Sequence, residues 1–262
     1  MNDYWAKRAA EQARILYDKT LEQTEKELAR QYKTALKAVK TDIGALYDKL
    51  AAAEEISVND LYKFDRFVKL SRRMNTELNR LGTEELRIMT EKYSVMAEAV
   101  NKAIAAEAVD TIGKEFLLLD NDRVKEIINS VWCADGKHFS TRIWEDKKAL
   151  QATLEKSLVD SVSRGLPKDE AVKFISRNFN TTFSNTDRIV RTELAHVQNT
   201  ATRDTYKKAG IQYVETIVAE DERLCDECAQ HNGKLTPIAA AREGVAYLFH
   251  PNCRCDILPI IE

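Results

Sequence analysis

Glycine and proline are scarce in this sequence, with 8 and 4 copies among 262 residues. That scarcity excludes an all-β fold, which needs frequent turn residues, and it argues against a proline-rich disordered chain. Apolar residues make up 44% and charged residues 31%. No apolar run approaches the roughly 18 residues of a membrane-spanning helix. The composition therefore predicts a helix-rich soluble protein with a buried core and no membrane partner.

The chain also lacks a strong excess of charge of either sign. Its formal net charge is -2, so tight binding of nucleic acid by bulk charge is not expected. Residues 1–5 lack the basic-then-apolar layout of a signal peptide. We therefore expect a protein made and used in a cytoplasm, where thiols stay reduced. The 5 cysteines then need an explanation other than disulfides.

The first half of the chain carries apolar residues at alternating spacings of three and four, which puts them on one side of a helix. Capping residues at 57–60, and Gly82 followed by Thr83, predict breaks between successive helices. Each apolar stripe must be covered, so these helices should pack on each other or on a partner. The stripes are Leu36, Val39, Ile43, Leu46 and Leu50; Leu61, Phe64, Phe67, Leu70, Met74, Leu78 and Leu81; and Leu86, Met89, Tyr93, Met96, Val100 and Ile104.

Two interpretations of residues 1–130 are open: an elongated docking bundle, and an ordinary helical core. A modest basic face in this region would allow weak, non-specific contact with DNA phosphates. Such a run is more often a solvated face of a helix. The face comprises Lys63, Arg66, Lys69, Arg72, Arg73 and Arg80.

Further helices are predicted in the second half, after a turn with aromatic anchors at 131–139. One helix restarts near Arg142 and ends at Gly165, because glycine stops a helix and Pro167 cannot continue one. Another begins at Lys168. The run 184–187 is rich in capping residues and predicts one more helix start.

Two apolar runs near the C-terminus, 211–218 and 256–260, are predicted to be strands. If they pair antiparallel, the end of the first lies beside the start of the second. That pairing would bring Cys225 and Cys228 against the run 250–255, which holds one histidine and two cysteines.

The converging side chains point to a zinc site, because tetrahedral Zn²⁺ takes four nitrogen or sulfur ligands. We predict Cys225, Cys228, His250 and Cys253 as ligands, with Cys255 as the rival to Cys253. His231 is a weaker candidate. With every position filled by protein, such a site is structural and holds together a lobe with little core of its own.

Three other interpretations of these residues are open. The cysteines can cluster without any metal. A redox pair at Cys225 and Cys228 would need the first thiol at a helix N-terminus inside a βαβ unit, whereas we expect a loop with acidic neighbours that raise a thiol pKa. A nuclease-like metal site would need an open position and a free histidine base, from His231 or His250.

A fixed order of short motifs runs through the second half. The Cys pair and the terminal His-Pro-Asn-Cys-Arg-Cys run are specific, whereas an Arg-Thr-Glu triplet alone would be weak. In chain order the motifs are Arg191-Thr192-Glu193, Asn199, Gly210-Ile211, Asp221-x-x-x-Cys225-x-x-Cys228-x-x-x-x-Gly233 and His250-Pro251-Asn252-Cys253-Arg254-Cys255, preceded by Trp132, Gly136, Phe139 and Arg142-Ile143-Trp144.

This order resembles the Mu F-like head morphogenesis family of tailed phages, over about residues 131–262. The resemblance implies a minor protein of the phage head (procapsid) that associates with the portal protein during assembly, and in some cases with packaged DNA or its delivery. The major capsid or scaffold protein is a further expected partner. The implied location is the virion, inside the head, after assembly in the host cytoplasm. Tyr213, Val214 and Thr216 stand where the family usually has a tryptophan.

We therefore predict a mainly α protein with a small α+β C-terminal domain that contains a short antiparallel β pair. An elongated helical region spans 1–130, and a Mu F-like domain spans 131–262, with the Cys/His lobe at 211–262. We expect no enzymatic activity and a monomer in isolation. The alternative is a metal-dependent enzyme, nuclease-like or transferase-like, that uses the Cys/His lobe.

Arg191 and Glu193 stand two residues apart, so they do not share a face of a helix. We expect each to make a separate ion pair that clamps the helix onto the Cys-rich lobe. A catalytic role for the two is the alternative.

Overall fold

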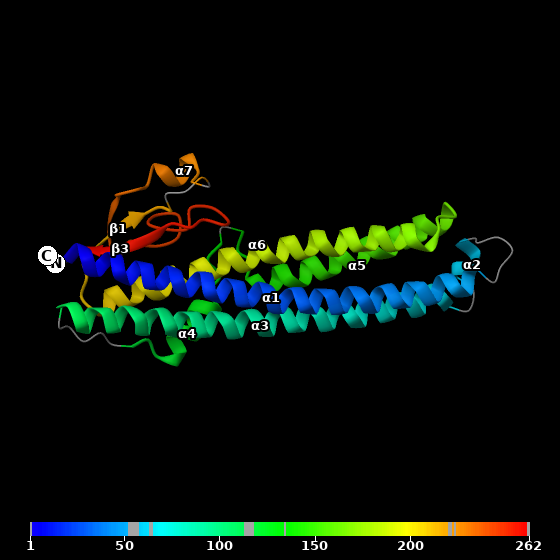
Figure 1. The fold of residues 1–262 in the computed structure, drawn as a ribbon, viewed down its shortest axis with the longest axis horizontal. Helices are drawn as coiled ribbons and strands as arrows, with labels where there is room; N and C mark the ends of the chain where they lie inside the picture. The colour runs from blue at the N-terminus through cyan, green and yellow to red at the C-terminus, as the bar shows by residue number, and fades with distance from the viewer. Residues whose placement is uncertain are drawn as a thin grey trace. The chain divides into compact units, whose positions relative to one another are not determined.

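A computed structural model describes residues 2–51, 58–62, 65–112, 118–133, 135–219, 222 and 224–260. This part of the chain is mainly helical with one small sheet, as the composition predicts (Figure 1). The elements, in chain order, are α1 (Asn2–Leu50), α2 (Val58–Tyr62), α3 (Arg66–Ile112), α4 (Asn121–Ile128), α5 (Phe139–Ser163), α6 (Lys168–Lys208), β1 (Tyr213–Ile217), α7 (Asp226–Ala229), β2 (Leu235–Pro237) and β3 (Asp256–Ile260).

The chain divides into two compact units, each assembled from separated stretches. Unit 1 comprises Met1–Thr24, Met89–His138 and Arg188–Glu262, whereas unit 2 comprises Glu25–Ile88 and Phe139–Asp187. The long helices α1, α3 and α6 each contribute one portion to each unit. The division of the sequence at residue 130 stays a prediction.

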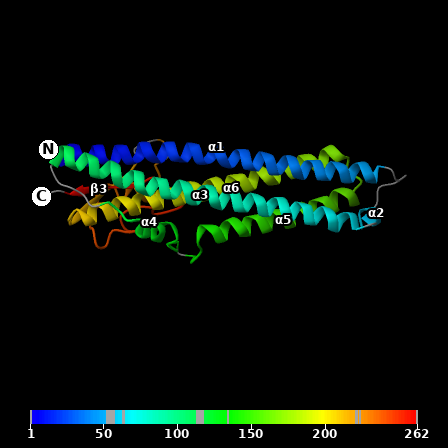
Figure 2. The same ribbon diagram turned by 90° about the horizontal axis from the view of Figure 1, so that it is seen from below.

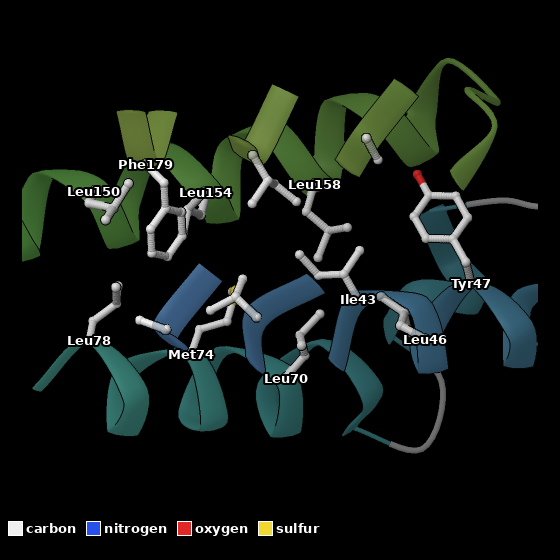
Figure 3. Packing of buried hydrophobic residues seen from close by; sticks show 14 of the residues in the cluster. Ile43, Leu46, Tyr47, Leu70, Met74, Leu78, Leu150, Leu154, Leu158 and Phe179 are labelled. Carbon is white, nitrogen blue, oxygen red and sulfur yellow. The ribbon is translucent and has the colours of Figure 1, made fainter. Parts of the chain in front are cut away.

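Unit 2 is a helical bundle whose core comes from α1, α2, α3, α5 and α6. Figure 3 shows Ile43 of α1 between Leu70 of α3 and Leu158 of α5, with Phe179 of α6 further along the same core. The apolar stripes predicted from the sequence therefore cover one another here. Buried members of this core are Tyr32, Ala35, Val39, Ile43, Leu46, Tyr47, Leu50, Leu61, Leu70, Met74, Leu78, Leu81, Leu150, Leu154, Leu158, Val162, Ala171, Ile175 and Phe179.

Two of the predicted helix breaks are wrong. Gly82 lies inside α3, and the ring of Trp144 packs so closely that a Cβ at Gly82 would lie 2.7 Å from Cζ3. The run 184–187 lies inside α6. There the Ser184 hydroxyl donates to the carbonyl of Asn180, one turn back, so a residue typical of caps is satisfied within the helix.

The predicted stop at Gly165 is confirmed, because α5 ends at Ser163 and Gly165 has a φ of 61°, the left-handed conformation that favours glycine. Of the predicted break at 57–60, residue 57 lies outside the described residues and Val58 begins α2. Lys63 of the basic face and Phe64 of the second stripe also lie outside them.

Unit 1 surrounds the last part of α6 almost completely, although this part is rich in polar residues. Between Thr192 and Tyr206, Arg203 alone is only partly buried. Buried polar groups need partners, and neighbouring segments supply them: the Asn101 amide donates to Thr205, and the Arg123 guanidinium bonds Asp204 at 2.6 Å. The buried polar side chains of α6 therefore require hydrogen-bonding partners from the segments that pack around this helix.

The sheet of unit 1 is antiparallel, with strand order β2-β1-β3. Val214 pairs with Thr236 of β2 on one side and with Pro259 of β3 on the other. The predicted pairing of the two apolar runs is therefore confirmed, while β2 was not predicted. Figures 1 and 2 show β3 beside the N-terminal part of α1. Across the described residues, no helix is both long and apolar enough to cross a membrane.

Candidate metal centre

The sheet sets the position of the cysteine-rich segments. Ile217, the last residue of β1, pairs with Asp256, the first residue of β3. Cys255 immediately precedes β3, so it lies at the edge where the chain leaves β1 towards α7. A register fixed by five paired positions thus brings the two Cys-bearing stretches together.

Cys225 and Cys228 are held by the short helix α7. Cys225 is its N-cap, with its Sγ accepting a hydrogen bond from the backbone N–H of Cys228 at 3.4 Å. We expected a loop here, and that expectation is wrong. A single helical turn places the two sulfurs on the same side, so two cysteines separated by two residues can bind the same metal ion.

Three distances define the cluster. His250 Nε2 lies 3.2 Å from Cys225 Sγ and 3.0 Å from Cys228 Sγ. Cys228 Sγ lies 3.7 Å from Cys253 Sγ. Two sulfurs on one tetrahedral zinc, each about 2.3 Å from it, are about 3.8 Å apart, so the sulfur pair fits a shared ion. The donor set, thiolates with one imidazole, is also what zinc prefers.

All five predicted residues are brought together, in two overlapping groups. Cys225, Cys228 and His250 form one, and Cys228, Cys253 and Cys255 form the other; within each, the ligand atoms lie within 4.8 Å of one another. These residues could hold a metal ion. Which four do so stays a prediction. The ring of His231 stacks on Phe249, with centroids 3.9 Å apart.

The imidazole of His250 is oriented for binding. Its Nδ1 lies 2.8 Å from the carbonyl oxygen of Pro251, which can only accept, so Nδ1 carries the proton. Nε2 is then left with a lone pair that faces the sulfurs of Cys225 and Cys228. A backbone partner of this kind commonly fixes the tautomer of a metal-binding histidine.

The thiols differ in their electrostatic surroundings. The backbone N–H of Cys228 lowers the pKa of Cys225, whereas burial raises the pKa of Cys228 to about 12. The hydrogen bond from Cys255 lowers the pKa of Cys253 to about 5. The expectation of a raised thiol pKa is therefore wrong for Cys225, because the backbone N–H of Cys228 outweighs the opposing effect of burial. Burial and donors decide these values.

Helix α6 supports the cluster through side-chain hydrogen bonds that the sequence did not predict, although Thr192 and Asn199 are residues of the motifs named above. Thr192 Oγ1 accepts from the backbone N–H of Asn252 at 3.1 Å, and the Asn199 amide donates to the carbonyl of Cys255 at 3.3 Å. Gln198 donates to Asp256 at 2.6 Å. The available signal was the run of polar residues on all faces of this helix, since such a helix must be buried among polar partners.

Glu193 is buried and accepts a hydrogen bond from the indole N–H of Trp132 at 2.9 Å. The backbone carbonyl of Arg191 accepts from the hydroxyl of Tyr17, and the Arg191 residue lines a cavity next to the cluster. The predicted ion pairs of Arg191 and Glu193 stay a prediction.

A second polar cluster lies on the same helix, around His196. Its Nδ1 is 2.7 Å from a carboxylate oxygen of Glu243, and its Nε2 is 2.9 Å from the Ser130 hydroxyl. The ring stacks on Trp132, with centroids 4.7 Å apart. These contacts join α6 to the loop that follows β2 and to the segment that follows α4.

Residues 152–258 match the family model described as Phage Mu protein F like protein. These residues form a Mu F-like segment. It begins within α5, contains the buried part of α6 and all five candidate ligands, and ends in β3. No curated protein and no solved structure matched the chain.

The resemblance predicted from the sequence is therefore confirmed, and it supports a phage head morphogenesis protein. The Mu F-like segment is shorter than the predicted domain, 131–262. The upstream residues Trp132 and Gly136 lie outside the match, so their part in the resemblance stays a prediction.

Proposed function

We propose that this protein is a minor head protein that associates with the portal during assembly of the phage head and stays inside the virion. The Mu F-like segment carries this proposal, since the family match is to a phage head protein. Major capsid or scaffold protein would be secondary contacts, and DNA contact would be weak. Assembly would take place in the host cytoplasm.

The Cys/His lobe would serve this role as a rigid structural element. Zn²⁺ held by Cys225, Cys228, His250 and one of the two later cysteines would hold α7 against the start of β3. A site filled by four protein ligands leaves no position for water, so the protein would act by binding and not by catalysis. The sheet of unit 1 has few residues of its own, which makes such a crosslink valuable.

Co-expression with the portal protein of the same phage tests the assembly role. We expect the two proteins to co-purify and to elute together on size-exclusion chromatography, with one zinc per chain by metal analysis. If the portal elutes alone while this chain is folded, the portal association is wrong.

The coordination of the metal distinguishes a structural site from a catalytic one. Substituting Co²⁺ for zinc should give the visible spectrum of a tetrahedral, thiolate-rich site that is unchanged by small anions. A spectrum that shifts when azide is added would reveal an open position, and would favour the metal-dependent enzyme instead.

A further inference from the structure

A cavity of about 640 Å³ lies within unit 1, next to the Cys/His lobe. Its walls come from α1, from the buried part of α6, from the end of β1 and from the run 253–258. This volume falls in the range of cavities that hold ligands. One wall therefore belongs to the candidate metal centre itself, while the opposite wall is the N-terminal part of α1.

Three arginines from three separate elements line this cavity. Arg14 belongs to α1, Arg191 to α6, and Arg254 stands between Cys253 and Cys255. Lys7 adds a fourth cation. Guanidinium groups present fixed forks of donors that match carboxylate oxygens in pairs. These four cations stand against three carboxylates in the same lining, so the recess has room for one further negative charge and not for many.

Arg14 is the most exposed of the three. Among the described residues, no hydrogen bond or ion pair engages its guanidinium, and Arg14 interacts through space with the carboxylate of Asp256. Asp256 is itself held by Gln198 at 2.6 Å. The donors of Arg14 therefore still face solvent at the cavity, ready for a ligand.

The other lining residues restrict which anion fits. Glu11 and Asp18 flank Arg14 on α1, at spacings of three and four residues. With Asp256, the lining holds three carboxylates, which repel a polyanion such as duplex DNA more than a single carboxylate, and a recess does not admit a duplex. Apolar lining residues, among them Leu21, Ile217 and Leu258, add surface for an aliphatic side chain.

We propose that this cavity binds a short acidic segment of another protein of the phage head, with a carboxylate on Arg14 and an adjacent apolar side chain on the lining. The proposal deepens the proposed assembly function and rests on it. It names a site and a chemistry for one of the partners. Because Arg254 lies between two candidate ligands, the same loop serves the metal centre and this cavity.

Fluorescence anisotropy with the isolated full-length protein tests the site directly. The probe is a fluorescein-labelled peptide with a single glutamate next to a leucine in an otherwise uncharged sequence, and its control replaces that glutamate with glutamine. The variant Arg14→Glu removes the guanidinium. Lys19→Glu is its matched control, because Lys19 is exposed on the same helix, outside the cavity, and changes the net charge equally. Circular dichroism checks that both variants are folded.

We expect the acidic peptide to bind, the glutamine peptide to bind much more weakly, and Arg14→Glu to weaken binding at least about tenfold while Lys19→Glu leaves it unchanged. Three results would overturn the proposal: no binding of the acidic peptide, an equal loss in both variants, or displacement of the peptide by duplex DNA. The assay needs no portal protein, so failed co-purification and failed peptide binding are separate results.

Discussion

The ring of Trp144 on α5 lies against Gly82 on α3, so close that a Cβ at Gly82 would be 2.7 Å from Cζ3 and 3.1 Å from Cη2. Gly82 costs the helix about 1 kcal/mol of propensity relative to alanine. The close approach of the two helices explains why the glycine is nevertheless present.

Replacing Gly82 with alanine should therefore have an effect whose sign depends on Trp144. In the wild-type background we expect a loss of about 1 kcal/mol in unfolding free energy, because overpacking costs about 1–3 kcal/mol and exceeds the gain in propensity. In a Trp144→Ala background the same change should stabilise by about 1 kcal/mol. A double-mutant cycle by urea unfolding measures both. Equal effects in the two backgrounds would contradict the packing explanation.

The buried pair of Lys147 and Glu85 should be costly to break. Their side chains are 3% and 0% exposed, and Lys147 Nζ lies 2.8 Å from Glu85 Oε1. It also donates to the Tyr32 hydroxyl, which contacts Thr186, so four helices share one polar layer. Lys147→Met leaves a buried carboxylate alone and should cost about 3–5 kcal/mol.

A second substitution, Glu85→Leu, provides the control. Adding Glu85→Leu to Lys147→Met removes the stranded carboxylate, whose pKa burial already raises. We expect the double variant to be more stable than Lys147→Met in urea unfolding, because replacing a whole buried pair with apolar groups is often neutral. A double variant less stable than the single one would contradict the idea that a stranded carboxylate causes the loss, and a double variant less stable than the wild type would mean that the pair contributes net stability.

Acid should weaken unit 1 through Glu243. Burial opposes ionisation, but the hydrogen bond from His196 outweighs it, and the pKa of Glu243 falls below 4.5. A carboxylate with a lowered pKa contributes stability that is present above its unfolded value and is lost as the pH falls through its folded value. We expect the unfolding free energy to fall below about pH 4.5, and Glu243→Gln to fall less steeply.

Urea unfolding between pH 7 and pH 3, followed by tryptophan fluorescence, measures this difference, since Trp132 stacks on His196. The ordinary pKa of glutamate, about 4.3, lies inside this pH range. Parallel curves for the two proteins would mean that Glu243 does not carry the acid sensitivity.

Metal removal should destabilise the Cys/His lobe. A chelator such as EDTA should lower the melting temperature of the wild-type protein, because metal binding contributes to folding free energy. Cys228→Ser should abolish metal binding, since Cys228 belongs to both groups of candidate ligands. Cys133→Ser is the matched control, as Cys133 belongs to neither group. A chelated protein that melts at the same temperature would mean that no metal stabilises this lobe.

A Co²⁺ titration distinguishes Cys253 from Cys255, the two rivals for the fourth ligand position. Cys253→Ser and Cys255→Ser should differ in Co²⁺ affinity, the larger loss marking the ligand. Both thiols are buried, so a difference in Co²⁺ affinity between the two variants would not come from a difference in solvent exposure. Equal losses would indicate that both cysteines bind the ion.

Much of the local structure could be predicted, because it depends on nearby residues. The apolar spacing around Ile43 and Leu70 predicted helices that bury one side, and the Gly165–Pro167 pair predicted the end of α5. The two apolar runs, 211–218 and 256–260, predicted an antiparallel pair that brings Cys225 and Cys228 against the run 250–255. Predicted breaks at Gly82 and at 184–187 failed, since their local signals were outweighed by the close packing of Trp144 and by hydrogen bonds within α6.

The sequence by itself determined that most of the chain is helical, which two runs pair as strands, and which five side chains approach one another, because periodicity and motif spacing are properties of neighbouring residues. Only the tertiary structure decided what surrounds α6, that Thr192 and Asn199 hold the cysteine-bearing loop, and that Arg14 shares a cavity with Arg254. Those contacts join residues dozens to hundreds of positions apart, and their partners are selected by packing and by the need to satisfy buried polar groups.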